Sequence, residues 1–317
     1  ALEGSPPSCS GLPVYDAKQG WYGVALSGFG IIFNKPVCKR IGQPEPRSWE
    51  DLAQPGFRSW IASGDPRSSG AVHMCYEIVL QARGYAEGWS LATRLCANVR
   101  NYGENAGAAP REVAAGEAAA GMAIDQYAQT VIDETGRDQL AFCLPASNTI
   151  VNPDAIAMLR GAANPELASL FIEFTLSPEG QRILFQPAGK NGQRYPLHRA
   201  PVRSSLYADP DAPRSNPYDF KSDFKYDNQR GSRRWGITND LIGVWLIDSH
   251  PELSAAWRRI IARGCRQDEM AALCAPPVAE ADIDRLVAEM KDPRVRAALL
   301  ADWSKQARAR YNAIARH

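Results

Sequence analysis

Apolar runs and amphipathic segments alternate along the first two thirds of the chain. The run Trp21–Asn34 is rich in β-branched and aromatic residues, which predicts a long buried strand. Shorter apolar runs predict further strands at residues 58–63, 118–124, 140–144 and 155–159. Because helical patterns separate these runs, we expect an α/β fold with a largely parallel sheet.

Between the strands, apolar positions recur three and four residues apart, as on one face of a helix. Residues 71–83 follow this pattern and stop at Gly84, a residue suited to a helix C-terminus. Ser48 and Ser177 precede short helical segments as N-caps. Further helices are expected at residues 86–99, 110–115, 165–176, 240–247, 251–263, 279–291 and 293–315, and another ends at Gly136. Residues 186–235 are rich in Pro, Arg and Asp, which predicts an extended surface segment.

The charges nearly cancel, with 36 Lys and Arg against 35 Asp and Glu. A nucleic-acid surface usually needs a marked basic excess, so no nucleic-acid partner is expected. No apolar run approaches the roughly 20 residues of a membrane-spanning helix. The first 16 residues lack the charged start and apolar block of a signal peptide. These observations predict a soluble chain, whether mature, truncated or cytosolic.

The chain holds seven cysteines and no C-x-x-C motif, which disfavours zinc and thioredoxin chemistry. Cys265 and Cys274 flank a short segment and are candidates for a disulfide. Cys9 and Cys38 are candidates for a second. An odd number of cysteines leaves at least one thiol unpaired within the chain.

The motifs of several common enzyme classes are missing from the sequence. There is no phosphate-binding G-x-x-x-x-G-K-[ST], no G-x-G-x-x-G, no H-E-x-x-H and no G-x-S-x-G. The four histidines are scattered, and no Ser/His/Asp or Cys/His set is evident. This lowers the odds of an enzyme, and we predict a binding protein without a catalytic residue.

The loop Asp65–Gly70 is the first candidate site, because it lies between a predicted strand and a predicted helix. Unpaired backbone N–H groups at a helix N-terminus attract anions. Ser68 and Ser69 add hydroxyl donors, Arg67 adds positive charge, and Gly70 lets a ligand approach the backbone. The alternative is that the serine only caps the helix.

Asp125-Gln-Tyr127 is the second candidate, at the carboxyl end of a small-residue strand, where ligands of open α/β sheets bind. Asp125 would accept from a cationic group or ligate a hard cation, and Tyr127 would donate to an anion or ligate a metal. The alternative is an N-cap aspartate beside a packed tyrosine. Asn152-Pro-Asp154, a turn before a predicted strand, is a third candidate with the same ambiguity, and the loop 105–108 is a weaker fourth.

The order of several short motifs resembles a known family. They occupy residues 21–34, 48–52, 65–71, 113–117, 121–125, 152–154, 164–168 and 171–181. Together they resemble the family 1 extracellular solute-binding proteins, in the branch described as ferric-iron or phosphonate receptors. The resemblance covers about residues 21–184 and is weak over the C-terminal region.

The resemblance implies an α/β fold of the periplasmic-binding-protein-like type II, with two lobes joined by crossing strands and an α-helical C-terminal region. Residues 1–35 and 148–317 would form lobe 1, which includes the C-terminal helices, and residues 36–147 would form lobe 2. A small anionic solute, or a metal or metal–anion complex, would bind between the lobes. The implied protein is a periplasmic or extracellular monomer that delivers its ligand to an ABC permease.

Two departures from the family pattern matter. Only 20 residues precede Trp21, so lobe 1 is expected to lack its opening βαβ units; a fragment, a mispredicted start and a divergent form all fit. Iron-binding members place adjacent tyrosines where this chain has Gln126 and Tyr127. Tyr127 and Asp125 alone are a small ligand set for bound Fe(III). The alternative functions are an enzyme, with these two residues as acid and base, or a ligand-sensing module on the same scaffold.

Overall fold

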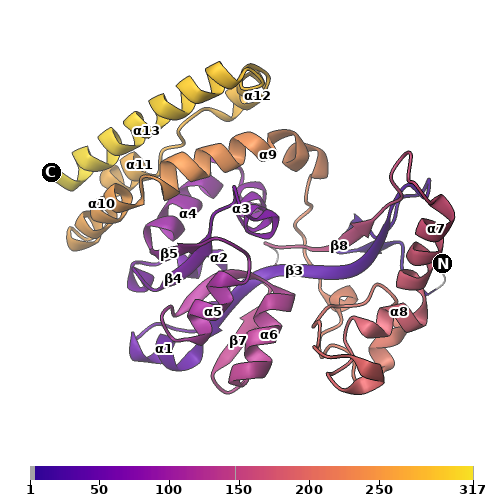
Figure 1. Cartoon of the computed structure of the whole chain (residues 1–317). Coiled ribbons are helices and arrows are strands. Elements are labelled where there is room, and N and C mark those ends of the chain that lie inside the picture. Colours follow the sequence, from indigo (N-terminus) through magenta and orange to yellow (C-terminus); the bar gives the residue numbers. More distant parts are fainter. Residues whose placement is uncertain (1–3, 147, 317) are drawn as a thin grey trace.

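One long strand, β3 (Tyr22–Asn34), connects two α/β bodies of unequal size in the computed structural model (Figure 1). The structure describes residues 4–146 and 148–316. The first half of β3 pairs antiparallel with β8 (Val151–Ile156). Its second half pairs antiparallel with β6 (Ala120–Ile124) and β7 (Leu140–Cys143). The long apolar run predicted as a strand is therefore the strand common to both bodies.

The larger body contains a sheet with the strand order β5-β4-β6-β3-β7. Its strands β4 (Ile61–Gly64), β5 (Val99–Gly103) and β6 are parallel to one another. Ile31 and Phe33 of β3 pack in one apolar cluster, whereas Ile32 between them packs in another, because successive side chains of a strand point to opposite faces.

Helices cover both faces of this sheet. The first cluster includes apolar residues of α3 (Gly70–Arg83) and α4 (Tyr85–Ala97), and the second includes those of α5 (Ala108–Ala114) and α6 (Asp125–Thr135). The short helices α1 (Lys35–Arg40) and α2 (Trp49–Leu52) follow β3 along the chain. Because β4, β5 and β6 are parallel, the segments that follow them emerge at one edge of the sheet.

The smaller body is built on β8 and the start of β3. It adds the hairpin β1 (Ser8–Cys9) and β2 (Leu12–Pro13), the helices α7 (Pro165–Leu176) and α8 (Pro178–Ile183), and a long irregular segment. Its core is small and includes Leu26, Val151, Leu176 and Val202. The predicted helix at 165–176 is confirmed, with Asn164 as its N-cap.

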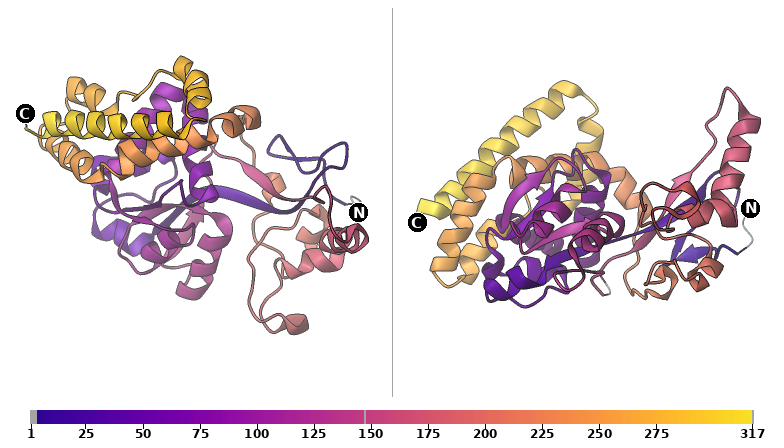
Figure 2. Two further views of the ribbon diagram at one scale, coloured as in Figure 1. Left: turned by 45° about the horizontal axis from the view of Figure 1, so that its top comes forward. Right: turned by 60° about the horizontal axis from the view of Figure 1, so that its bottom comes forward.

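Among the described residues, five α-helices form most of the C-terminal region. They are α9 (Asn228–Ile242), which continues as a π-helical turn at Gly243–Ile247, α10 (His250–Ala262), α11 (Gln267–Cys274), α12 (Ile283–Glu289) and α13 (Pro293–Arg316). Their apolar residues belong to the same core as those of α3 and α4. The views in Figure 2 show these helices on the larger body, at the opposite end of the molecule from the smaller one. The division implied by the resemblance groups these helices with lobe 1, as a C-terminal extension.

Several predicted boundaries are wrong. The strand expected at 155–159 lies at Val151–Ile156, because its pairing partner is the first half of β3. The segment expected to be extended up to residue 235 is helical from Asn228, where Asp227 caps α9. The start of this helix is polar, so no apolar periodicity marked it. Helix α11 was not predicted.

The two predicted disulfides are not present, and all seven cysteines are free. Cys9 lies in the core of the smaller body, whereas Cys38 lies in the core of the larger one. Cys274 is buried at the end of α11, and Cys265 lies in the turn before that helix with a positive φ of 55°. Among the helices that the structure describes, none is long and apolar enough to cross a bilayer.

Candidate functional site

Three segments meet at the carboxyl edge of the parallel strands. They are residues 65–69 after β4, residues 104–107 after β5, and the start of α6 after β6. The hydroxyl of Ser68 donates to the carbonyl oxygen of Glu104 at 3.0 Å, which joins the first two segments. The ring of Tyr127 lies beside Gly107, 3.6 Å from where a Cβ would stand, which joins the third. Two predicted site segments are thus brought to one edge.

Ser69 is the N-cap of α3, and its side-chain oxygen accepts from the backbone N–H of Val72 at 3.4 Å. The backbone N–H groups of this first turn have no partner within the helix and carry partial positive charge. The indole of Trp235, from α9, lies 3.7 Å from where a Cβ on Gly70 would stand. An aromatic side chain from the C-terminal region therefore lies beside the predicted anion-binding turn.

Arg67 is engaged by two carboxylates. Its Nη1 and Nη2 donate to both oxygens of Asp248 at 2.9 and 2.8 Å, and its Nε and Nη2 donate to Asp65 at 3.0 and 2.7 Å. The bonds to Asp248 and Asp65 raise the pKa of Arg67. The positive charge predicted to face a ligand is therefore balanced within the protein, partly by the loop before α10.

A second polar group of residues lies where the two bodies join. Asp125, the first residue of α6, accepts from the backbone N–H of Gly28 in β3 at 2.8 Å. The next residue toward the smaller body, Ser27, donates to Asp154 of β8 at 2.8 Å, and Asp154 also forms an ion pair with Arg199. Asp125 and Asp154 thus bind neighbouring residues of β3.

Asn152 belongs to the same region, because it pairs with Ser27 across β3 and β8. Its side-chain oxygen is buried, and within residues 4–146 and 148–316 it has no hydrogen-bond partner. Ser27 and Arg199 were not predicted as site residues. A small polar residue within a long apolar strand was a signal for Ser27, whereas no local pattern marked Arg199.

The Asp125 carboxyl group has a raised pKa. Desolvation raises its pKa from 3.8 to about 7, and the nearby Asp154 adds to this effect. The hydrogen bonds from Gly28 and Gln126 and the charge of Arg199 lower the pKa and offset part of it. The carboxyl group therefore changes its charge near neutral pH, at the junction of the two bodies.

His73 is a structural residue of α3. Its side chain is buried, its Nδ1 lies 2.6 Å from Oδ1 of Asn239, and its ring stacks on Trp235 at 3.5 Å between centroids. Burial lowers its pKa. The part of the chain that the structure describes contains no group of three or more His, Cys, Asp or Glu side chains suited to hold a metal ion.

The family profile described as bacterial extracellular solute-binding protein matches residues 9–218. The chain therefore belongs to this family. The match begins in the smaller body, includes the larger sheet with its loops, and ends before α9. The family and the structural neighbours are described as binding proteins.

Two curated relatives are similar to this chain over part of their length. The phosphoglycerate transport regulatory protein PgtC of Salmonella typhimurium is 28% identical over 197 residues, which are 62% of this chain and 48% of that protein. An uncharacterized protein of Haemophilus influenzae is 27% identical over 165 residues, 51% of this chain and 46% of that protein. The chain spans about half the length of the curated relatives it matches.

Solved structures with a similar fold include periplasmic binding proteins and ferric-binding proteins. AfuA from Actinobacillus pleuropneumoniae, with fructose-6-phosphate bound, is 21% identical, has a TM-score of 0.55, and matches 72% of this chain and 65% of its own. The apo ferric ion-binding protein A of Pasteurella haemolytica is 14% identical with a TM-score of 0.57, over 72% of this chain and 70% of its own. The fold is the predicted α/β type II periplasmic-binding-protein fold, with a helical C-terminal region.

Proposed function

We propose that this chain is the solute-binding part of an extracytoplasmic receptor that delivers a small anionic solute to an ABC permease. The observation that carries the proposal is that the α3 N-terminus, Tyr127 and Asp125 follow the parallel strands at one edge of the sheet, and that Asp125 also contacts β3 beside Asp154 of the smaller body. These groups come from both bodies, and a solute that contacted both would favour their closure by a hinge motion. Family membership supports the receptor function.

The proposed solute carries a phosphate or a similar oxyanion together with hydroxyl groups. The first turn of α3 and the hydroxyl of Ser69 would bind the oxyanion. Asp154 and the unpartnered oxygen of Asn152 would accept hydrogen bonds from hydroxyl groups of the solute. A relative that is a phosphoglycerate transport regulatory protein, and a structural neighbour with fructose-6-phosphate bound, support this class of solute.

Ferric iron is the second candidate solute, because ferric-binding proteins are among the structural neighbours. A hard cation needs several oxygen ligands. Asp125 already accepts hydrogen bonds from two backbone amides, at 2.8 and 2.7 Å, and Tyr127 is the one tyrosine of its motif. This arrangement favours the oxyanion over the metal.

Isothermal titration of the whole chain with 3-phosphoglycerate, fructose-6-phosphate, a phosphonate and Fe(III)–citrate tests the proposal. We expect saturable binding of at least one phosphorylated solute. Ser69→Asp should weaken that binding at least 100-fold, because a fixed negative charge would repel the oxyanion; a charge pair about 4 Å apart at the protein surface is worth about 4 kcal/mol. Aspartate is itself a good N-cap, so α3 should keep its start.

Ser177→Asp is the matched control, because Ser177 caps α8 in the smaller body with the same type of hydrogen bond. The Ser177→Asp variant should bind the phosphorylated solute with the same affinity as the unaltered protein. If the Ser69→Asp variant bound the solute as tightly as the unaltered protein, the oxyanion would not bind at the N-terminus of α3. Binding of Fe(III)–citrate alone would favour the metal, and failure of every solute to bind would overturn the receptor proposal for this chain.

A further inference from the structure

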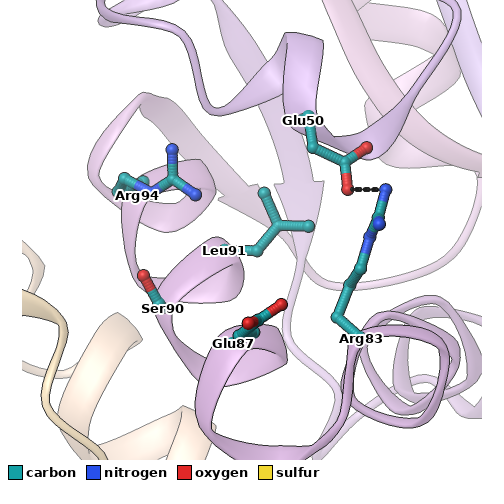
Figure 3. A pocket seen from close by; sticks show the side chains of 6 residues that line it. All are labelled: Glu50, Arg83, Glu87, Ser90, Leu91 and Arg94. Carbon is teal, nitrogen blue, oxygen red and sulfur yellow. Dashed lines mark ion pairs between the residues drawn. The ribbon is translucent and has the colours of Figure 1, made fainter.

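A cavity of about 300 Å³ lies on the outer helical layer of the larger body, formed by α2, the end of α3 and α4. It is lined by Glu50, Arg83, Glu87, Ser90, Leu91 and Arg94 (Figure 3). None of these residues belongs to the segments at the carboxyl edge. Helix α3 begins at that edge and ends in this cavity, which is about 20 Å away along its 14 residues. The cavity is therefore a separate place on the molecule.

The lining of the cavity presents both signs of charge around an apolar centre. Glu50 and Arg83 form an ion pair on one side of Leu91, and Arg94 lies on the other side (Figure 3). Glu87 lies one helical turn before Leu91 in α4, because residues four apart share a helix face. Two acidic and two basic side chains therefore surround one buried aliphatic side chain.

Two buried polar atoms of this lining lack hydrogen bonds. Oε2 of Glu50 and Nε of Arg94 have no partner among residues 4–146 and 148–316. A buried group without a partner typically costs about 1–3 kcal/mol, more for a charged group. Glu50 and Arg94 line the same cavity with opposite charges, so one small molecule with a cationic donor at one end and an anionic acceptor at the other would complement both side chains.

We propose that this cavity is a second binding site, for a free amino acid. The carboxylate of the amino acid would accept from Arg94, in a charge-assisted hydrogen bond. Its ammonium group would donate to Glu50 and Glu87, and an aliphatic side chain would cover Leu91. A volume of about 300 Å³ is at the lower end of known ligand sites, which suits a molecule of this size.

Ligand-observed NMR and calorimetry with L-alanine, L-valine and L-serine test the site. We expect saturable binding with a Kd below about 1 mM. N-acetyl-L-valine and L-valinamide should bind at least tenfold more weakly, because each lacks one of the two charges. Arg94→Gln should also weaken binding at least tenfold, and Glu87→Gln several-fold. Arg100→Gln is the control, because Arg100 pairs with Glu117 on the surface outside the cavity, and it should bind as the unaltered protein does.

Circular dichroism of each variant checks that the fold is retained, and the exposed Glu87 provides a variant that should not disturb the core. The site is overturned if no amino acid saturates the unaltered protein below about 10 mM. It is equally overturned if Arg94→Gln and Glu87→Gln bind with unchanged affinity, or if the acetylated and amidated compounds bind as tightly as valine. The readout is amino-acid binding alone, so the result is independent of the solute at the carboxyl edge.

Discussion

Asp125 connects the two bodies of the protein through a single carboxyl group. It starts α6 in the larger body and accepts a hydrogen bond from Gly28 of the shared strand β3. Asp154 and Arg199, from the smaller body, are close enough to shift its pKa in opposite directions. Because desolvation is the largest effect, the pKa rises to about 7. The charge at the junction of the two bodies therefore depends on pH in the neutral range.

The stability of the protein should respond to this carboxyl group. The folded-state pKa of about 7 lies above the ordinary 3.8, so the folded protein keeps a proton that the unfolded chain releases as the pH rises. The stabilisation is complete below pH 4 and is lost as the pH rises to 7. Urea unfolding at pH 4 and at pH 7 measures this effect. Between the two pH values, the free energy of unfolding should fall by about 1–4 kcal/mol more for the unaltered protein than for Asp125→Asn. The exposed Asp284→Asn should follow the unaltered protein. Parallel curves for the unaltered protein and Asp125→Asn would contradict the raised pKa.

Helix α9 attaches the C-terminal region to α3 through two successive residues. Arg234 is 4% exposed, and its Nε donates to both carboxylate oxygens of the fully buried Glu77, at 2.8 and 3.1 Å. The next residue, Trp235, stacks on His73. A charged pair in this position requires both partners, because either charge alone would remain buried without compensation. The attachment lies beyond the family match, so it is an addition to the matched part of the chain.

Removal of one partner of this pair should be costly. Arg234→Met should lower the free energy of unfolding by about 3–5 kcal/mol, because Glu77 would stay buried without its ion pair. The double variant Arg234→Met with Glu77→Leu should recover much of the loss. Arg230→Met is the control, because Arg230 forms an exposed pair with Asp227 and should cost less than about 1 kcal/mol. If Arg234→Met and Arg230→Met lowered the free energy of unfolding equally in chemical denaturation, this result would argue against a buried ion pair.

At the scale of the whole molecule, the two bodies differ in how completely their apolar residues are covered. The apolar stripe of α7 is exposed, with Leu170 at 62% and Phe171 at 58%, whereas Leu176 at the end of the same helix is 1% exposed. Figure 1 shows α7 at the outer edge of the smaller body. In the described chain this apolar face of α7 is exposed to solvent. Exposed apolar patches favour association with other molecules.

Substitutions of exposed and of buried apolar residues on α7 should therefore affect stability differently. Phe171→Ser should change the free energy of unfolding by less than about 1 kcal/mol, since little burial is lost, and it should reduce the fluorescence of the dye ANS bound to the folded protein. Leu176→Ala should cost about 2–5 kcal/mol, as a core truncation does. A loss for Phe171→Ser as large as that for Leu176→Ala would show that the stripe is covered in solution.

Local sequence patterns were sufficient to predict most elements and to locate two of the candidate segments at strand ends. The apolar run at 21–34, the helical spacing at 71–83 and the caps at Ser48, Ser69 and Ser177 are local properties, because they depend on backbone geometry within a few residues. The polar start of α9 and the paired segment β8 had no such local signal. Their boundaries follow from contacts with α3 and with β3.

The groups that meet in the folded protein are distant in the sequence. Arg67 pairs with Asp248 across 181 positions of sequence, Asp125 binds Gly28 across 97, and Asp154 pairs with Arg199 across 45. Charge complementarity alone does not select such partners, since the chain holds 36 basic and 35 acidic residues. The order of strands in the sheet and the docking of α9 bring these particular side chains together. The same contacts desolvate Asp125 and occupy Arg67, so the electrostatics of the predicted site are a property of the folded molecule.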